Sequence, residues 1–359
     1  MKARTNLVDL SYIGITMGCP VGIGPEIILK FLANFHGSDR FQPVVIGDIG
    51  VLQHCAEQLG IVAEIKPWRL GEIAKPGSIM VQQPAQANGI SLSASELVWG
   101  QPSRATGLAM AAWIEEAVRL VRKGEMVAMV TCPITKSALQ GAGYDYPGHT
   151  EMLADLCQTK DYAMMMAGAS LRVTLVTIHQ GLARVAACLS QDKIFQLIEM
   201  TGRSLRTDFG LPQPQMAVAG FNPHAGEGGM FGDEEGRIIA PAIEQARAGG
   251  WQVTGPFPPD TVFHKAVHGQ YDAVICMYHD QGLIPFKLLH FEDGVNVTIG
   301  LPIVRTSVDH GTAYDIAGQG KANPSSLQAA FQMATLIVDN RQRAGALFST
   351  HRCRTGVKC

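Results

Sequence analysis

Residues 106–133 read TGLAMAAWIEEAVRLVRKGEMVAMVTCP and combine a helix, a strand and a polar ending in one run. Apolar side chains recur at helical spacing in its first part, at Leu108, Ala112, Ile114, Val118 and Val121. This spacing predicts an amphipathic helix over 106–123. The apolar run MVAMV at 126–130 then predicts a buried strand. A helix followed at once by such a strand is typical of α/β proteins with a mostly parallel sheet.

The same alternation of short apolar runs and longer helical stretches extends over most of the chain. We expect further strands over 12–17, 43–46, 171–177, 216–221 and 273–277. We expect further helices over 25–35, 51–59, 191–207 and 235–248. The stretch 82–102, rich in Ser, Gly, Pro and Gln, predicts a long loop. The length of 359 residues favours about two domains.

Composition and charge exclude several classes of protein. Hydrophobic residues make up 47% of the chain and charged residues 17%, which indicates a globular protein with a large core. A net charge of −2 and an aromatic content of 7% argue against a nucleic-acid partner or an anionic membrane surface. No apolar run is long enough to span a bilayer, and the charged first ten residues are unlike a signal peptide. Because the eight cysteines form no CxxC pair, we expect a reduced, cytoplasmic protein.

Polar side chains follow four of the predicted strands at the point where each strand ends. They are Thr131, His179, the pair Asn222 and His224, and the pair His279 and Asp280. In open α/β sheets, ligands bind beyond the carboxyl ends of the strands. We therefore expect these polar residues, which are far apart in the sequence, to converge on one site.

Three of these strand-end residues, His179, His224 and His279, are candidate metal ligands. Neutral imidazole is a good ligand for zinc and other divalent transition metals. Three imidazoles would leave the positive charge of the ion available to polarise a substrate oxygen. The alternative for each histidine is an ordinary core or surface residue, because the three are not in a local metal-binding motif.

Several other positions are candidates for binding an anion. Residues 147–151 (PGHTE) predict a turn that runs into a helix, where Thr150 either caps the helix or helps its N-terminus to hold an anion. Lys136, Lys287 and Arg305 are cations in stretches that carry little other charge. Arginine and lysine suit phosphate binding, and the alternative is a solvated surface position. Asn296 lies between two valines and needs a partner if it is buried.

Two glycine-rich stretches are candidate backbone cradles. Residues 22–26 (GIGPE) resemble a dinucleotide fingerprint only superficially, because Ile27 stands where the last glycine belongs. We therefore reject a Rossmann fold and expect a tight turn or a loop that lines the site. Residues 310–324 (HGTAYDIAGQGKANP) contain small residues that let backbone amides approach a ligand closely. Asp315 could accept a hydrogen bond from a ribose hydroxyl or cap the next turn.

A set of long motifs resembles the 4-hydroxythreonine-4-phosphate dehydrogenase family of vitamin B6 biosynthesis. The motifs are GIGPE at 22–26, TCPITK at 131–136, YPGHTE at 146–151, NPHAGEGG at 222–229, PPDTVF at 258–263, MYHDQG at 277–282 and GVNVTIGLPIVRTSVDHGTAYDIAG at 294–318, followed by KANP. The likeness extends from about residue 12 to about residue 335. Residues 310–324 are also similar to the adenine-binding loop of isocitrate and isopropylmalate dehydrogenases. One departure is Cys19, which stands where many members have an acidic residue.

The resemblance implies a fold of two α/β/α domains with a central cleft, like that of isocitrate and isopropylmalate dehydrogenases. Residues 1–133 with 300–359 would form the NAD-side domain, and residues 134–299 the metal- and dimer-forming domain. The implied assembly is a homodimer with its active site at the subunit interface. One divalent ion (Zn, Mg, Mn or Co) would be held by His179, His224 and His279, one of them from the partner subunit.

The resemblance also implies roles for individual residues. Substrate contacts would come from His149, Thr150, Lys287, Asn296 and Arg305. NAD would lie against His310, Gly311, Thr312, Ala313, Asp315 and Asn323. The base that takes the proton of the substrate hydroxyl is, by position only, Asp260, Asp280 or Lys136.

The implied reaction is oxidation of the 3-hydroxyl of 4-phosphohydroxy-L-threonine by NAD, followed by loss of CO2. A second branch of the family oxidises 4-phospho-D-threonate or 4-phospho-D-erythronate to dihydroxyacetone phosphate and CO2, and no single residue decides between the two. From other classes, a metal-dependent aldolase or hydrolase acting on a sugar-acid phosphate and a non-catalytic metabolite-binding protein remain alternatives. An assay for NADH separates the dehydrogenases from both.

Overall fold

The computed structural model describes residues 10–35, 40–84, 92 and 97–345. Contacts divide the chain into two compact units, the first within Met1–Gln158 and Ile303–Cys359 and the second within Thr159–Pro302. The expected loop over 82–102 and the expected character of the first ten residues fall largely outside the described residues. Among the helices of the described residues, none combines the length and the apolar character needed to cross a bilayer.

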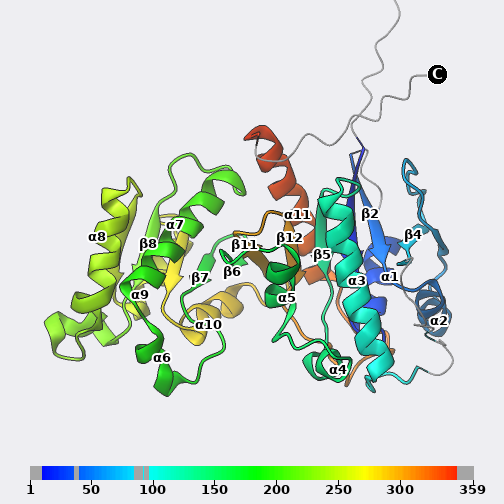
Figure 1. Cartoon of the computed structure of the whole chain (residues 1–359), viewed down its shortest axis with the longest axis horizontal. Coiled ribbons are helices and arrows are strands. Elements are labelled where there is room, and N and C mark those ends of the chain that lie inside the picture. The colour runs from blue at the N-terminus through cyan, green and yellow to red at the C-terminus, as the bar shows by residue number, and fades with distance from the viewer. Residues whose placement is uncertain (1–9, 36–39, 85–91, 93–96, 346–359) are drawn as a thin grey trace, which may run out of the picture. The chain divides into compact units, whose positions relative to one another are not determined.

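The first unit is built on strands that all run parallel to their neighbours (Figure 1). In spatial order they are β3 (Glu64–Pro67), β4 (Ser78–Gln82), β2 (Phe41–Ile46), β1 (Ser11–Thr16), β5 (Ala128–Thr131) and β12 (Arg305–Val308). The helices are α1 (Gly24–Ala33), α2 (Ile49–Leu59), α3 (Arg104–Arg122), α4 (Lys136–Gly141), α5 (His149–Leu156) and α11 (Ser325–Arg343). Helix α1 contacts α2 and α11, whereas α3 contacts α4 and α5. This grouping corresponds to a helix layer on each face of the sheet.

The second unit contains a mixed set of strands (Figure 1). Their order is β11 (Val295–Ile299), β6 (Ala163–Ala167), β7 (Arg172–Leu175), β10 (Ala273–Cys276), β8 (Met216–Ala219) and β9 (Val253–Phe257). Strand β6 is antiparallel to both of its neighbours, and the remaining pairs are parallel. The helices are α6 (Leu182–Cys188), α7 (Gln191–Thr207), α8 (Ala240–Ala248), α9 (Pro259–Val267) and α10 (His279–Leu289), with shorter helical turns at η2 (Pro223–Gly229) and η3 (Glu235–Ile239).

The α/β class and the mostly parallel sheet predicted from the sequence are confirmed. Strands β1 and β2 are buried at every position, as expected for parallel strands that are covered on both faces. Helix α3 forms with a reciprocal cap between Ser103 and Thr106. Its buried face differs from the predicted one, because Met110 and Trp113 are buried whereas Leu108 is only half-buried.

The border between the two units, after Gln158, differs from the expected domain boundary after residue 133. The expected boundary after residue 133 would assign α4 and α5 to the second domain, whereas their contacts with α3 group them with the first unit. The functional roles assigned to the two domains stay predictions.

We predict opposite effects for two glycine-to-alanine changes in neighbouring helices. Gly107 of α3 packs so closely on α4 that an added Cβ would collide with the backbone carbonyl of Ala138. Gly107→Ala should therefore lower the free energy of unfolding by about 1–3 kcal/mol or more. Gly141 of α4 has open space at its Cβ position, so Gly141→Ala should raise the free energy of unfolding by up to about 1 kcal/mol. Urea denaturation of both variants measures the difference, and equal effects would contradict the packing described for α3 and α4.

Candidate functional site

The first unit contains a buried guanidinium at the start of β12. The Arg305 side chain donates from Nε and Nη2 to Oγ1 of Thr131, at 3.2 and 2.7 Å, and the residue is 3% exposed. Burial lowers the pKa of Arg305, and the carboxylate of Glu151 opposes that shift. The planar guanidinium carries directed N–H donors, and such a group is suited to binding an anion such as a phosphate group.

His149 lies next to this guanidinium, at the first position of α5. Its Nε2 atom is buried and has no hydrogen-bond partner among the described residues. Burial, reinforced by the positive charge of Arg305, holds the pKa of His149 well below its usual value. The imidazole is therefore neutral, and its unsatisfied Nε2 is an atom that a bound hydroxyl or phosphate oxygen would satisfy.

Of the two roles considered for Thr150, the helix cap is not observed. Helix α5 begins after Gly148, and no side chain caps its first turn. Thr150 is instead half-buried within that turn, one position from His149. The Lys136 side chain approaches the same turn, because a Cβ on Gly148 would lie 3.9 Å from its Cε and 3.5 Å from Oε2 of Glu151. The structure therefore groups four of the predicted residues, Lys136, His149, Thr150 and Arg305, within the first unit.

The loop predicted to hold NAD, residues 310–323, packs on the turn at 22–26. The amide of Ile23 donates to the carbonyl of Thr312 at 3.1 Å, and a Cβ added to Gly22 would lie in tight contact with the same residue, 3.1 Å from its carbonyl oxygen. The stretch 22–26 therefore contains the end of a tight turn and the first residues of α1, and it supports this loop. Ala313 adopts a left-handed conformation with φ of 41°, which is unusual for a residue with a side chain and marks a constrained path.

Cys19 is tied to the same loop. Its Sγ lies 3.3 Å from Oη of Tyr314, and that hydroxyl also hydrogen-bonds to Oγ1 of Thr135. Burial, reinforced by the hydrogen bond to Cys19, raises the pKa of Tyr314 to about 12. Cys19 thus has a neutral hydrogen-bond partner.

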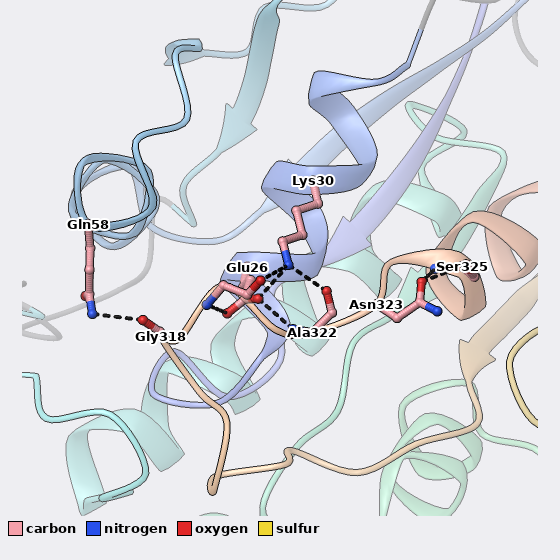
Figure 2. Close-up of polar contacts among 8 residues, drawn as sticks. Glu26, Lys30, Gln58, Gly318, Ala322, Asn323 and Ser325 are labelled. Atoms are coloured by element: carbon pink, nitrogen blue, oxygen red, sulfur yellow. Dashed lines mark hydrogen bonds and ion pairs between the residues drawn. The ribbon is translucent and has the colours of Figure 1, made fainter.

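The predicted cofactor residues at the ends of the loop have defined local contacts. Oδ1 of Asn323 accepts from the amide and the hydroxyl of Ser325, at 3.0 and 2.7 Å (Figure 2). This bond presents the Nδ2 amino group as the donor that remains for a ligand. Nδ1 of His310 lies 3.1 Å from the carbonyl of Gly311, and Asp315 is exposed.

In the second unit, two of the three predicted metal ligands come together. The rings of His179 and His279 have centroids 6.1 Å apart. Thr177 brings the two segments together, because its amide and its hydroxyl both donate to the carbonyl of Met277, at 3.2 and 2.8 Å. Nδ1 of His279 lies 2.6 Å from Oδ1 of Asp280, which leaves Nε2 of His279 for a metal. A carboxylate in this position orients a ligating imidazole.

The third histidine, His224, lies in a different environment. Residues 224–228 have consecutive positive φ angles, between 43° and 81°, and the His224 ring lies 6.1 Å from that of Phe231. Within the described ranges, no group of three or more His, Cys, Asp or Glu side chains is arranged to hold a metal ion. One chain therefore supplies a histidine pair, and a three-histidine site remains a prediction.

Sequence reasoning missed the residue that supports the His224 turn. Glu235 is 6% exposed and accepts from the amides of Phe221 and Asn222, both at 2.7 Å, and from Nδ2 of Asn222 at 2.9 Å. A carboxylate with this many donors fixes the backbone that enters the turn. The motif at 222–229 ends before Glu235. In the sequence, the position of Glu235 in the next helical segment is the one sign that it holds the backbone before the His224 turn.

The remaining predicted residues of the second unit are dispersed over its elements. Asp260 is an exposed residue in the first turn of α9, and Lys287 is a half-buried residue in the last turn of α10. Asn296 lies on β11, where its Oδ1 is buried without a hydrogen-bond partner in the described part of the chain. This orphaned oxygen agrees with the expectation that Asn296 needs a ligand as its partner.

Comparisons with known proteins identify the class and then the family. The chain is 43% identical to a crystal structure of 4-hydroxythreonine-4-phosphate dehydrogenase from Klebsiella pneumoniae, with a TM-score of 0.82 and coverage of 91% of this chain and 99% of the other. This match confirms the α/β dehydrogenase fold. Residues 39–334 match the family model described as pyridoxal phosphate biosynthetic protein PdxA. The chain belongs to this family, as its motifs indicated.

Two curated relatives illustrate the range of names within the matches. A 4-hydroxythreonine-4-phosphate dehydrogenase from Desulfosudis oleivorans is 56% identical over 90% of this chain and 94% of its own length. A protein from Salmonella typhi named "Putative D-threonate 4-phosphate dehydrogenase" is 44% identical over 91% of this chain and 99% of its own length. Both names describe dehydrogenases of four-carbon phosphorylated acids.

We predict that His149 makes folding sensitive to acid. Its pKa in the native state lies well below the usual 6.5, so in the native protein it stays neutral at a pH where the unfolded chain takes up a proton. His149 therefore leaves the free energy of unfolding unchanged above about pH 6.5 and lowers it as the pH falls below that value. As the pH falls from about 8 to about 5.5, the melting temperature of His149→Gln should rise relative to that of the wild type. A difference in melting temperature that stays constant across this range would contradict the buried, neutral imidazole.

Proposed function

We propose that this protein oxidises the 3-hydroxyl group of 4-phosphohydroxy-L-threonine with NAD and that the product then loses CO2, as a step of pyridoxal phosphate biosynthesis. The observation that carries the proposal is the buried Arg305 guanidinium beside the unsatisfied Nε2 of His149. A buried cation and a neutral imidazole together suit a substrate that ends in a phosphate group. The names of the relatives support the same class of substrate.

Arg305, His149 and Thr150 bind the phosphate end of the substrate in this proposal. Arg305 supplies the charge, and Thr131 orients the guanidinium through its Oγ1 atom. His149 then accepts or donates one hydrogen bond through Nε2. Binding energy gained at the phosphate holds carbon 3 in place for hydride transfer. Lys287 and Asn296 of the second unit supply further polar contacts to the substrate.

His179, His224 and His279 hold one divalent ion (Zn, Mg, Mn or Co), with one of the three coming from the partner subunit. The close approach of His179 to His279 and the Asp280 carboxylate on Nδ1 of His279 support this assignment. A divalent ion bound by these histidines would supply positive charge that polarises a substrate oxygen. Asp280 acts by orienting His279, so Lys136 and Asp260 are the better candidates for the base.

NAD lies against residues 310–323, whose constrained backbone and small side chains support a close approach of the cofactor. His310, Gly311, Thr312 and Ala313 contact it through the first part of the loop. Asp315 accepts from a ribose hydroxyl, and Asn323 donates from Nδ2. NAD supplies the hydride acceptor for carbon 3.

A homodimer with its active site at the subunit interface is part of this proposal. Helix α10 and the residues after it carry large apolar side chains that are strongly exposed, at Ile284 (68%), Leu288 (84%) and Phe291 (77%). Exposed apolar side chains in such a cluster are typical of an interface with another protein. Lys287 lies on the same helix, so the interface would adjoin a substrate contact.

The buried, unpaired cysteines among the described residues support a reducing compartment, the cytoplasm.

The proposal is tested by supplying the purified protein with NAD, a divalent metal and either of two substrates. NADH formation at 340 nm with 4-phosphohydroxy-L-threonine, at a kcat/KM at least tenfold above that with 4-phospho-D-threonate, is the expected result. The reverse preference would assign the protein to the branch of the D-threonate relative. Turnover of neither acid, or cleavage without NADH, would contradict the dehydrogenase and favour a binding protein or an aldolase.

We predict that Arg305→Lys raises the KM for the phosphorylated substrate about tenfold or more, because a lysine cannot reproduce two directed hydrogen bonds from a planar group. The KM for NAD should change less than twofold. The control is Arg237→Lys. Arg237 lies in η3 and not on β12, and it forms an exposed ion pair with Asp233. Steady-state kinetics of both variants gives the comparison. An unchanged substrate KM for Arg305→Lys would show that the phosphate binds elsewhere.

A further inference from the structure

An ion pair on α1 takes no part in the site described so far. Lys30 Nζ lies 2.8 Å from Oε1 of Glu26, one helical turn away. The Glu26 side chain is 0% exposed and that of Lys30 is 24% exposed. A fully buried carboxylate costs free energy unless it is paired and hydrogen-bonded, so its partners indicate its role.

Those partners are backbone groups of the loop that we assign to NAD (Figure 2). Oε1 of Glu26 accepts from the amide of Ala322 at 2.7 Å, and Oε2 accepts from the amide of Gly320 at 3.2 Å. Nζ of Lys30 donates to the carbonyls of the same two residues, both at 2.7 Å. The ion pair therefore hydrogen-bonds to the amide and to the carbonyl of both Gly320 and Ala322. The two carbonyls and the Glu26 carboxylate use all three protons of the Lys30 ammonium.

A second contact fixes the loop two residues earlier (Figure 2). Nε2 of Gln58 on α2 donates to the carbonyl of Gly318 at 2.9 Å, while its Oε1 accepts from Nε1 of Trp99 at 2.7 Å. Gly318 has a φ of 71°, and an added Cβ would lie 2.7 Å from the Trp99 ring. The path of residues 318–322 is thus set from two helices by contacts to its backbone.

We infer that Glu26 and Lys30 are positioning residues for the nucleotide part of NAD, because they fix the backbone that leads directly into Asn323. This inference rests on the proposed NAD-dependent function. The two side chains bond to the loop only through its amides and carbonyls, so they determine its shape without contacting the reacting atoms. Asn323 follows Ala322 at once, and its amide is oriented by Ser325. A displaced loop would therefore weaken NAD binding and leave the phosphate site around Arg305 intact.

The test compares four forms of the full-length, metal-loaded protein: the wild type, Glu26→Gln with Lys30→Met, Gln58→Met, and Glu244→Gln as control. The double variant removes both charges together, so no unpaired charge is left buried. Glu244 belongs to an exposed ion pair with Arg247 on α8, a helix of the second unit. The measurements are the KM for NAD, the KM for the phosphorylated acid, kcat, NAD binding by calorimetry and amide hydrogen exchange of the peptide that contains 318–323.

The double variant should raise the KM and the dissociation constant for NAD about tenfold and accelerate amide exchange at Gly320 and Ala322. Its kcat at saturating NAD and its KM for the phosphorylated acid should stay within twofold of the wild type. Gln58→Met should raise the KM for NAD about threefold, and Glu244→Gln should match the wild type.

Unchanged NAD affinity in the double variant, with a wild type that binds NAD, would overturn the positioning role alone. A parallel loss of kcat and of both affinities would also overturn it, because that pattern indicates a general structural role. If the double variant does not fold, Gln58→Met decides in the same way through its affinity for NAD. A wild type that binds no NAD would instead overturn the proposed function, and the hydrogen-exchange data would still report whether the ion pair orders the loop.

Discussion

Buried charge is the constraint on which the organisation of the first unit depends. Arg305 and Glu26 are both almost fully removed from water, and each would be strongly destabilising without partners. Glu26 is satisfied completely by Lys30 and by two loop amides. Arg305 bonds to Thr131, and its neighbour His149 retains an unsatisfied nitrogen. The Glu26 charge therefore supports the fold, whereas Arg305 lies beside a nitrogen of His149 that a ligand would satisfy.

Glu26 and Arg305 therefore differ in role, because Glu26 supports the loop and Arg305 is a candidate to contact the substrate. The backbone of 310–323 is held by the segment 22–26 and by the Glu26–Lys30 pair, so its shape exists before any cofactor binds. Preorganisation of this kind reduces the entropy that a ligand loses on binding. The second unit contributes a pair of histidines and a strained left-handed turn at 224–228, whose backbone is fixed by Glu235. Strain of this kind at a motif that carries a candidate ligand is typical of functional sites.

Much of the fold could be predicted from the sequence. Continuous apolar runs located β1, β5, β8 and β10, and α7 was predicted with its observed bounds, 191–207. Strand β6 was missed because its short methionine-rich run, AMMMA, carries no periodicity that separates a strand from a helix. Helix α11 was not predicted, although its buried side chains recur at helical spacing, at Leu327, Ala330, Phe331, Ala334 and Val338. The antiparallel pairing of β6 depends on partners distant in sequence, and no local pattern encodes it.

The site was predictable to a smaller extent, for a physical reason. Residue type and neighbours suggested His149 and Arg305, but burial beside each other is a tertiary property that only the folded chain reveals. Local propensity left Thr150 either as a cap or as part of an anion site, and only the folded chain shows that α5 begins without a side-chain cap. Glu26 offers the clearest case, because its partners Gly320 and Ala322 are backbone amides almost three hundred positions away. Backbone partners leave no residue-type signal in a sequence.

The central claim is that this family member couples hydride transfer from carbon 3 to loss of the carboxylate attached to carbon 2. The most direct measurement follows NADH and CO2 together in one reaction of 4-phosphohydroxy-L-threonine with the metal-loaded protein. The account predicts equal amounts of the two products at every time point after an initial lag. CO2 released without NADH, or NADH that accumulates with no CO2 at all, would contradict it.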